Sequence, residues 1–159
     1  MEYLISADPT NLDLDLIHQF LSEHSYWARG IPRDVVARSI SNSLCFGAYA
    51  FPNAQMDPEW RQVGFARVAT DRATFAYLAD VFVLPEHRGH GLSKRLMEAV
   101  LGHPDLQGLR RWLLATADAH ELYRRFGFTA LAQPGNFMQL HNPDVYKIAV
   151  PSHSPQQQR

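Results

Sequence analysis

A turn rich in glycine and basic residues lies in the middle of the chain. It reads Arg88-Gly89-His90-Gly91-Leu92-Ser93, follows the apolar run Val81–Leu84, and leads into a helical pattern beginning with basic residues. The first N–H groups of a helix have no partner within the helix, and the helix dipole places partial positive charge there. Glycine also lets the backbone approach a ligand closely. The spacing therefore predicts a phosphate-binding turn.

Two common nucleotide-binding motifs do not fit this turn. A P-loop requires G-x-x-x-x-G-K-[ST], but Lys94 follows Ser93 and no glycine stands at the required spacing. A dinucleotide fingerprint requires G-x-G-x-x-G, and Lys94 stands where the third glycine belongs. Both motifs are excluded, so the phosphate must belong to another kind of ligand.

The elements that position the turn can be predicted from hydrophobic periodicity. The first part of the chain predicts a short strand, a helix that begins near Asp8-Pro9-Thr10-Asn11 and a second helix that starts at Pro32. Three further strands follow with short connections, which implies antiparallel neighbours. The ranges are 3–6 for the first strand, 12–22 for the first helix and 44–51, 63–70 and 74–84 for the later strands.

After the turn, the pattern predicts a helix, a strand, a short helix and a final hairpin around Pro134-Gly135. The order is roughly βααβββαβαββ, a mixed α/β arrangement in which helices flank the sheet. Residues 1–150 are predicted to form one domain and 151–159 a disordered tail, because the tail has no apolar anchor. The four elements after the turn are expected at 92–101, 111–115, 119–126 and 128–132 with 137–141.

Composition excludes several classes of function. The chain has 159 residues and a formal net charge of −1, so no bulk basic field favours nucleic acid or an anionic membrane. No stretch approaches the roughly 20 apolar residues of a membrane span, and the N-terminus does not resemble a secretory signal. The single cysteine, Cys45, lies in an apolar run, which predicts a buried thiol and fits a reducing cytoplasm.

The turn resembles the R/Q-x-x-G-x-G/A signature of the Gcn5-related N-acetyltransferase (GNAT) family, with Arg88, Gly91 and Ser93 at the signature positions. Further along, the segment A-H-E-L-Y-R-R-F-G-F, residues 119–128, resembles the short helix of that family, which ends in a tyrosine and a Gly-Phe pair. The expected element order is also similar to the GNAT fold over nearly the whole chain. The resemblance implies a largely antiparallel mixed sheet and a turn that binds the pyrophosphate of acetyl-CoA.

The resemblance also assigns residues to the donor site. Ser93 stands where the family usually has Gly or Ala, and Thr116 where many members carry an asparagine near the pantetheine arm. For Lys94, Arg124 and Arg125 a solvated helix face is the competing interpretation, and for His90 a structural role in the loop. The expected acetyl-CoA contacts are Val81, Phe82, Val83, Arg88, Gly89, His90, Gly91, Leu92, Ser93, Lys94 and Thr116.

Acetyl transfer to an amine requires a polarised thioester carbonyl, a neutral amine and a protonated leaving thiolate. By the resemblance, backbone amides of residues 81–83 polarise the carbonyl and Tyr123 protonates the thiolate; the alternative is that Tyr123 only packs beside its apolar neighbours. Asp80 is the candidate that takes the proton of the amine, directly or through water; the alternative is a hydrogen bond to a nearby loop. His87 and His90 lack carboxylate or cysteine neighbours, so no metal site is predicted.

The loop Ser25–Ile31 is expected to cover the acceptor, because this connection does so in the family. Tyr26 and Trp27 supply aromatic walls suited to an apolar or cationic group, unless they plug the core beneath the loop. The resulting hypothesis is a cytoplasmic N-acetyltransferase that acts on a primary amine of a small molecule, amino acid or peptide. Members of the family often pair through sheet edges or terminal strands, so a homodimer and a monomer are both left open. The alternative is a non-catalytic acyl-CoA-binding or regulatory module. The acceptor is not identified.

Overall fold

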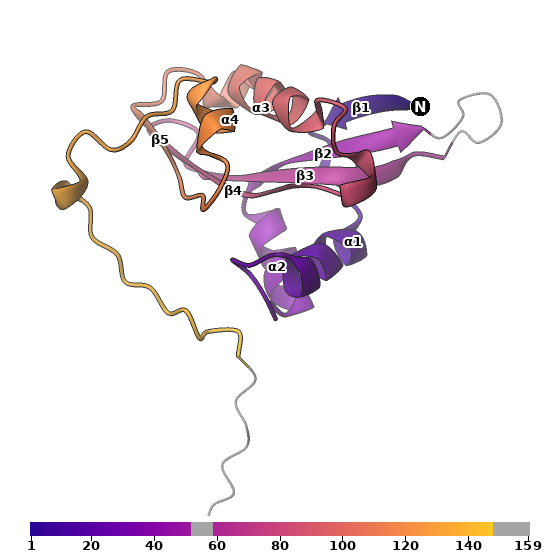
Figure 1. Ribbon diagram of the computed structural model, residues 1–159, viewed down its shortest axis with the longest axis horizontal. Coiled ribbons are helices and arrows are strands. Elements are labelled where there is room, and N and C mark those ends of the chain that lie inside the picture. The colour runs from indigo at the N-terminus through magenta and orange to yellow at the C-terminus, as the bar shows by residue number, and fades with distance from the viewer. Residues whose placement is uncertain (52–58, 148–159) are drawn as a thin grey trace, which may run out of the picture.

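A five-stranded sheet forms the centre of the computed structural model, which describes residues 1–51 and 59–147 (Figure 1). Its order follows the chain, β1-β2-β3-β4-β5. The first four strands pair antiparallel, and β5 pairs parallel with β4, which confirms the predicted meander and the mixed sheet. The strands are β1 (Glu2–Ser6), β2 (Leu44–Phe51), β3 (Arg61–Thr70), β4 (Phe75–Val83) and β5 (Arg111–Leu114).

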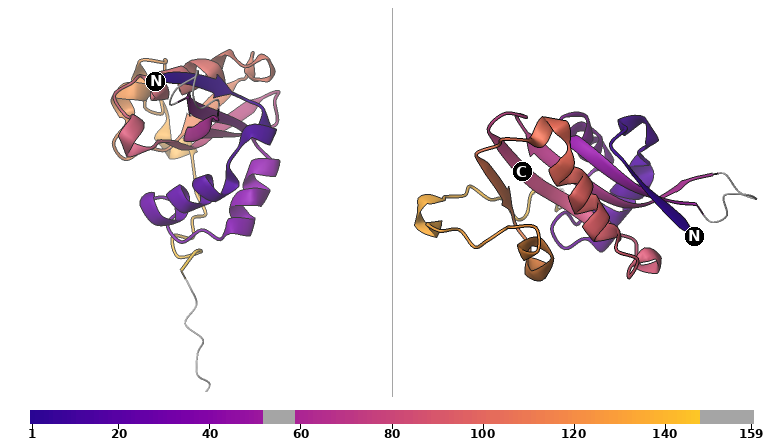
Figure 2. Two further views of the ribbon diagram at one scale, coloured as in Figure 1. Left: turned by 90° about the vertical axis from the view of Figure 1, so that its right-hand side faces the viewer. Right: turned by 90° about the horizontal axis from the view of Figure 1, so that it is seen from above.

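Helices cover both faces of the sheet. Helix α3 (Leu92–Gly102) lies across one face, while α1 (Leu14–Gln19) and α2 (Arg33–Ser41) cover the other (Figures 1 and 2). A short helix, α4 (His120–Arg124), follows β5. Strand β2 is buried from Leu44 to Ala50 because both of its faces meet apolar side chains, as its continuous apolar sequence requires.

The core is accordingly divided into two clusters, one on each side of the sheet. Phe46, Leu96 and Met97 belong to the cluster under α3. Cys45 and Phe65 belong to the cluster under α1 and α2. Burial of Cys45 is confirmed, and that burial raises the pKa of its thiol to about 12. At neutral pH the thiol therefore remains protonated and unreactive.

The first helix begins later than predicted. Asp8 caps a separate 3-10 turn, Pro9–Asn11, by accepting a hydrogen bond from the Thr10 N–H at 2.9 Å. Helix α1 has its own cap at Asp13, whose Oδ1 accepts from the Leu16 N–H at 3.0 Å. Two capping aspartates five residues apart thus divide a segment that periodicity alone treats as one helix.

Strand β4 contains a β-bulge at its centre. Ala66 of β3 faces two residues of β4, Asp80 and Val81. On a regular strand Leu78 and Phe82 would point to the same face of the sheet. The bulge between them reverses this, so that Leu78 packs in the cluster under α3 and Phe82 in the cluster under α1 and α2. The flanking register pairs are Phe65–Phe82 and Arg67–Ala79.

The predicted final hairpin is wrong. Residues 128–147 contain no strand (Figure 1). The segment is irregular apart from the 3-10 turn Pro134–Asn136 and a turn at residues 143–146, and Tyr146 at its end packs against the cluster under α1 and α2. The alternating pattern of residues 137–141 is compatible with a strand, but a strand also needs a partner edge, and none pairs with it within the described part of the chain.

The predicted tail, 151–159, lies outside the described residues. No helix within residues 1–51 and 59–147 is long and apolar enough to cross a membrane.

Candidate active site

The parallel pair β4–β5 opens into a fork next to the bulge. Backbone pairing between the two strands ends at Leu78 and Leu114. Beyond that point β4 keeps its pairing with β3, where the Leu84 N–H donates to the Val63 carbonyl at 2.8 Å. Because successive amides of a strand point to opposite edges, the Val83 N–H points toward the fork. The fork therefore presents backbone donors that β5 does not use.

The side chains of the strand itself are unavailable to a ligand there. Phe82 stacks on Phe20 at 3.9 Å between ring centroids, and Val83 packs in the opposite cluster. Val81 also packs against that cluster. Of the three residues predicted to hold acetyl-CoA on this strand, each can therefore contribute mainly through its backbone.

The glycine turn lies at the end of the same strand and leads into α3. Gly89 and Gly91 have φ values of +81° and +73°, a region that residues with a side chain rarely adopt. Nothing lies within 4 Å of a Cβ placed on either glycine, so the turn borders open space. Gly91 is the N-cap of α3 and has no side-chain cap, which leaves the first amides of the helix available.

The side chains around the turn, which were predicted to contact acetyl-CoA, bond to or pack against nearby protein groups. Arg88 bends back so that its Nε donates to the Val83 carbonyl at 3.1 Å. His90 places Nδ1 3.1 Å from the Arg88 carbonyl, which is the structural loop role. Lys94 lies on the exposed face of α3, 3.6 Å from Glu98. The Leu92 side chain is buried in the core, so only its backbone can reach a ligand.

Asp80 is held by two donors at the bulge. Its Oδ1 accepts from the Trp27 indole Nε1 at 2.8 Å, and its Oδ2 accepts from the Arg67 Nε at 2.8 Å. Its φ of +55° is unusual for a residue other than glycine and represents local strain that these contacts offset. The hydrogen bond to a nearby loop, which is the alternative role expected for Asp80, is therefore present. Its donor is Trp27, which is predicted to line the binding site of the acetyl acceptor.

The loop between the first two helices crosses the open end of the fork. Tyr26 places its hydroxyl 3.0 Å from the Ala117 N–H, which follows β5, while Trp27 bonds to Asp80 on β4. The two rings meet edge to face, with centroids 5.0 Å apart. Both are partly exposed, so they line a surface and do not plug the core. The loop is thus tied to both strands of the fork.

Tyr123 lies on α4, on the side of the fork formed by β5. Its side chain is only 8% exposed and packs edge-on against Phe128 with centroids 6.0 Å apart. Burial, and then the neighbouring Tyr26 and Asp118, raise the pKa of Tyr123 above that of a free phenol. Thr116 starts the connection to α4, where its hydroxyl accepts from the Ala119 N–H at 3.0 Å.

Comparison with known proteins identifies the family of this fold. The sequence profile of the Acetyltransferase (GNAT) domain matches residues 56–130. A protein of Gibberella zeae, provisionally assigned as an acetyltransferase, is 37% identical over 137 residues, which cover 77% of this chain and 76% of that protein. The chain belongs to the GNAT acetyltransferase family.

Solved structures agree with this assignment. A Xanthomonas campestris protein, provisionally assigned to the GNAT family, is 53% identical with a TM-score of 0.84, covering 92% of this chain and 98% of that chain. A Mycobacterium tuberculosis protein solved in complex with CoA and a second ligand shares 22% identity, with a TM-score of 0.59 and coverage of 80% and 72%. The second likeness shows that the GNAT fold is shared.

One residue of the candidate site, Arg67, was not predicted from the sequence. Arg67 joins Asp80 to Ser43, whose hydroxyl oxygen lies 3.1 Å from the guanidinium NH1. A lone arginine within the apolar strand 63–70 was the available signal, because a charge on a buried strand requires a partner. Among the described residues no group of three or more His, Cys, Asp or Glu is arranged to hold a metal ion.

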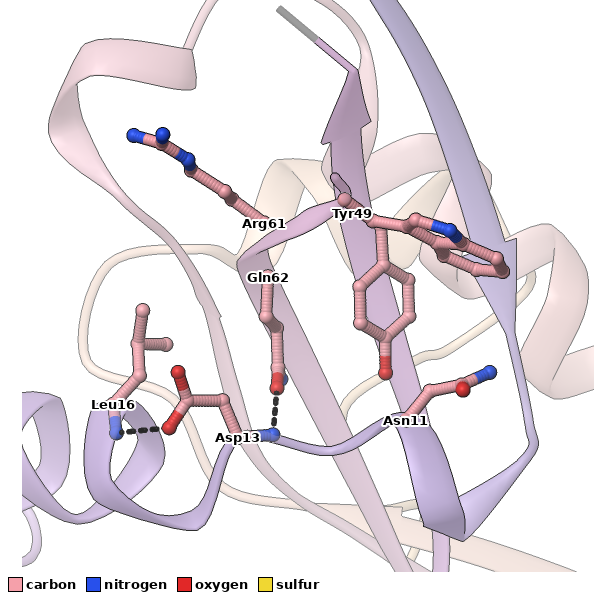
Figure 3. A pocket seen from close by; sticks show the side chains of 7 residues that line it. Asn11, Asp13, Leu16, Tyr49, Arg61 and Gln62 are labelled. Atoms are coloured by element: carbon pink, nitrogen blue, oxygen red, sulfur yellow. Dashed lines mark hydrogen bonds between the residues drawn. The ribbon is translucent and has the colours of Figure 1, made fainter. Parts of the chain in front are cut away.

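A second hollow lies at the other end of β2 and β3 (Figure 3). It measures about 400 Å³ and is lined by Asn11, Asp13, Tyr49, Trp60 and Gln62 among others. The Gln62 side chain fills one wall, where its Oε1 accepts from the Asp13 N–H at 2.7 Å. None of its lining residues lines the hollow along β5 that Thr116 and Tyr123 line, so the two hollows are separate.

Proposed function

We propose that this GNAT protein transfers an acetyl group from acetyl-CoA to the primary amine of a small molecule, amino acid or peptide. The observation that carries the proposal is the fork between β4 and β5, with the glycine turn at one end and a buried tyrosine beside it. Together these provide an anion cradle, unpaired backbone donors and a proton donor around one opening.

The donor would be held mainly by backbone. The turn residues Arg88–Lys94 would bind the pyrophosphate through their amides, and a cradle with open space above two left-handed glycines suits a bulky phosphate group. The amides of Val81–Val83 that face the fork would hold the pantetheine arm and polarise the acyl oxygen. Thr116, in the connection that follows β5, would border the same opening.

The reaction itself would proceed by direct attack. The neutral amine nitrogen forms a bond to the acyl carbon while the C–S bond breaks and the electron pair leaves on sulfur. Tyr123 gives its proton to that sulfur, and the amine nitrogen loses a proton to water or to Asp80. The phenol then regains a proton from solvent, and Asp80, where it has taken the proton of the amine, releases it to solvent, so that the protein is unchanged after each turnover.

Asp80 fits a positioning role better than that of a free base. Each of its carboxylate oxygens already accepts a hydrogen bond, one of them from a guanidinium. Both oxygens are thus already engaged, and taking a proton would weaken the charge-assisted bond from the Arg67 guanidinium. We therefore assign to Asp80 the task of orienting Trp27 over the acceptor, with water as the immediate proton acceptor.

The proposed activity can be tested by the release of CoA thiol from acetyl-CoA in the presence of a panel of amines and amino acids. We expect release that depends on the amine, together with an acetylated product detected by mass spectrometry. A non-catalytic acyl-CoA-binding module would instead bind acetyl-CoA, seen as a rise in Tm, without releasing thiol for any amine. That result would replace the enzyme hypothesis with the alternative.

Replacing Trp27 by phenylalanine is expected to raise the KM for the acceptor about fivefold to tenfold. The change removes the indole N–H that bonds to Asp80 but keeps an aromatic ring, and a hydrogen bond of this kind contributes on the order of 1 kcal/mol. The KM for acetyl-CoA should not change. Trp60→Phe, a partly exposed tryptophan in the separate hollow, is the matched control. An unchanged acceptor KM in Trp27→Phe would contradict the assignment of this loop to the acceptor.

A further inference from the structure

A chain of polar contacts crosses the sheet and ends at the loop between the first two helices, Ser25–Ile31, called the acceptor loop here. It begins at Ser43, whose hydroxyl accepts from the Arg67 Nη1 at 3.1 Å. The Arg67 Nε donates to Asp80 at 2.8 Å, and the other oxygen of Asp80 accepts from the Trp27 indole at 2.8 Å. Arg67 and Asp80 lie on the adjacent strands β3 and β4 (Figure 1). The acceptor loop is therefore connected to the middle of the sheet through one carboxylate.

The β-bulge determines the side of the sheet to which Asp80 points. Phe65 packs in the cluster under α1 and α2, and Arg67, two residues further along β3, faces the same side. On a regular strand Asp80 would share a face with Leu78, and its carboxylate would point into the apolar cluster under α3. The extra residue at the bulge and the φ of +55° bring Asp80 to the side of Arg67 instead. The bulge therefore places the carboxylate next to the acceptor loop.

Asp80 needs a charged partner to hold this position. The Asp80 side chain is only 10% exposed, and the Arg67 side chain beside it is 20% exposed. Burial of an unpaired carboxylate is costly, whereas a paired and hydrogen-bonded carboxylate is tolerated. Of the two donors that the structure describes on Asp80, the Trp27 indole is neutral and only Arg67 carries a charge. Arg67 is therefore the contact that Asp80 cannot replace.

Ser43 gives the Arg67 guanidinium its orientation. Arg67 pairs with Cys45 in the register of β2 and β3, and Ser43 directly precedes β2. The guanidinium donates through Nη1 to Ser43 and through Nε to Asp80. Because a guanidinium is a rigid planar group, two bonds at different nitrogens fix its plane as well as its place. A lysine ammonium would supply the charge but not this geometry.

We propose that Arg67 is a positioning residue for the acceptor. Oriented by Ser43, it holds Asp80, which in turn holds Trp27 and the acceptor loop. This inference rests on the proposed function, in which an acceptor amine binds beside Trp27. Arg67 itself does not touch the acceptor, because its Nε and Nη1 are engaged with protein groups and its side chain is largely buried. The affinity for the acceptor thus depends on a residue of β3 that lies behind the site.

The effect of Arg67 is confined to one side of the acceptor loop. On the side of β5, the Tyr26 hydroxyl accepts from the Ala117 N–H at 3.0 Å, a contact that is independent of the carboxylate. The glycine turn likewise has its own contacts, such as the bond from Arg88 to the Val83 carbonyl. Loss of Arg67 should therefore weaken acceptor binding without disturbing the site of acetyl-CoA.

The kinetic test replaces Arg67 by methionine, which keeps an unbranched side chain but removes the charge and the donors. We expect the KM for the acceptor to rise about tenfold, since the charge-assisted hydrogen bond to Asp80 is lost. The KM for acetyl-CoA and the kcat at saturating acceptor should change by less than about twofold. Arg67→Lys should recover part of the affinity, because an ammonium restores the charge but not the planar fork.

A double variant shows whether Arg67 acts through Trp27. Arg67→Met should add little to the rise in acceptor KM caused by Trp27→Phe, because both changes break the same connection. Arg72→Met, which removes a different arginine–aspartate pair, with Asp105 at 2.6 Å, is the matched control and should leave both KM values unchanged. Multiplicative effects in the double variant, or an unchanged acceptor KM in Arg67→Met, overturn the proposal.

The second test observes the Trp27 indole without any substrate. The chain has three tryptophans, so a proton–nitrogen NMR spectrum contains three indole N–H signals, and the signal that is lost in Trp27→Phe belongs to Trp27. Ser43→Ala removes only a hydroxyl, so it serves even where Arg67→Met fails to fold. We expect Ser43→Ala to shift the Trp27 signal and to speed its exchange with solvent, while the signals of Trp60 and Trp112 keep their positions.

The two tests separate this inference from the proposed function. If no amine causes thiol release, the proposed function fails, and a shifted Trp27 signal in Ser43→Ala still supports the connection from Ser43 to the loop. If thiol is released but the Trp27 signal is unchanged in Ser43→Ala, positioning through Asp80 is wrong. A raised acceptor KM in Arg67→Met together with that unchanged signal would mean that Arg67 contacts the acceptor directly.

Discussion

Replacing Tyr123 by phenylalanine is expected to lower kcat by about 10²-fold, with the KM for acetyl-CoA unchanged. The change removes only the proposed proton donor and keeps the ring that packs against Phe128. General acid catalysis contributes about 10²–10⁴-fold in enzymes. The lower end applies here, because proton transfer from a phenol with a pKa near 10 to the thiolate of a thiol with a pKa near 8.5 is unfavourable by about 2 kcal/mol. Burial, which raises the pKa of Tyr123 further, adds to this cost.

The same shift in pKa predicts the pH profile. A phenol with a raised pKa remains protonated through neutral and moderately alkaline pH, so the donor is present in its active form there. Deprotonation of Tyr123 should reduce wild-type kcat only above the pKa of an ordinary tyrosine. In Tyr123→Phe this alkaline decline should disappear. Steady-state kinetics at saturating donor and amine, from about pH 7 to pH 11, measure both effects.

Tyr49→Phe is the matched control for Tyr123. Tyr49 is also a buried tyrosine, and burial raises its pKa to about 12, but it lies in the separate hollow on β2. Its hydroxyl has no hydrogen-bond partner among the described residues, so its removal should leave kcat and folding intact. Turnover by Tyr123→Phe equal to that of Tyr49→Phe would reject the acid role.

The parts of the fold that local patterns determine were predictable. The apolar stripe Leu92, Leu96, Met97 and Val100 predicts α3, and all four side chains are buried. The run 44–51 predicts β2 with the bounds that the structure shows. The glycine turn was predictable for the same reason, since its left-handed backbone is encoded by the two glycines themselves.

Features that depend on distant partners were not predictable in this way. The bulge at Asp80 requires the pairing with β3 and the two donors Trp27 and Arg67, none of which is near Asp80 in the sequence. The segment 137–141 shows the complementary case. Its alternation is compatible with a strand, but a strand also needs a partner edge, and none pairs with it within the described residues. Local pattern specifies local conformation, whereas strand pairing depends on residues far away in the sequence.

Replacing Gly91 by valine is expected to weaken acetyl-CoA binding by about tenfold to a hundredfold, with kcat at saturating donor little changed. Valine is strongly disfavoured at a φ of +73°, and holding it there costs on the order of 1–3 kcal/mol. The turn will relax toward negative φ, which rotates the amides at the start of α3 away from the pyrophosphate. Because no protein atom lies near the added Cβ, the loss cannot come from a clash within the protein. Isothermal titration calorimetry with CoA measures the Kd directly.

Gly108→Val is the matched control that separates an effect on the glycine turn from a general effect of backbone strain. Gly108 has a φ of +71° and nothing within 4 Å of a Cβ, so Gly108→Val imposes the same backbone strain in the loop before β5. Both variants should lower Tm by a similar amount, but only Gly91→Val should lose affinity for CoA. Gly91→Asn should recover part of that affinity, since asparagine tolerates the left-handed region. Equal CoA affinity in Gly91→Val and Gly108→Val would mean that the turn does not bind the pyrophosphate, even if Tyr123 proves essential for turnover.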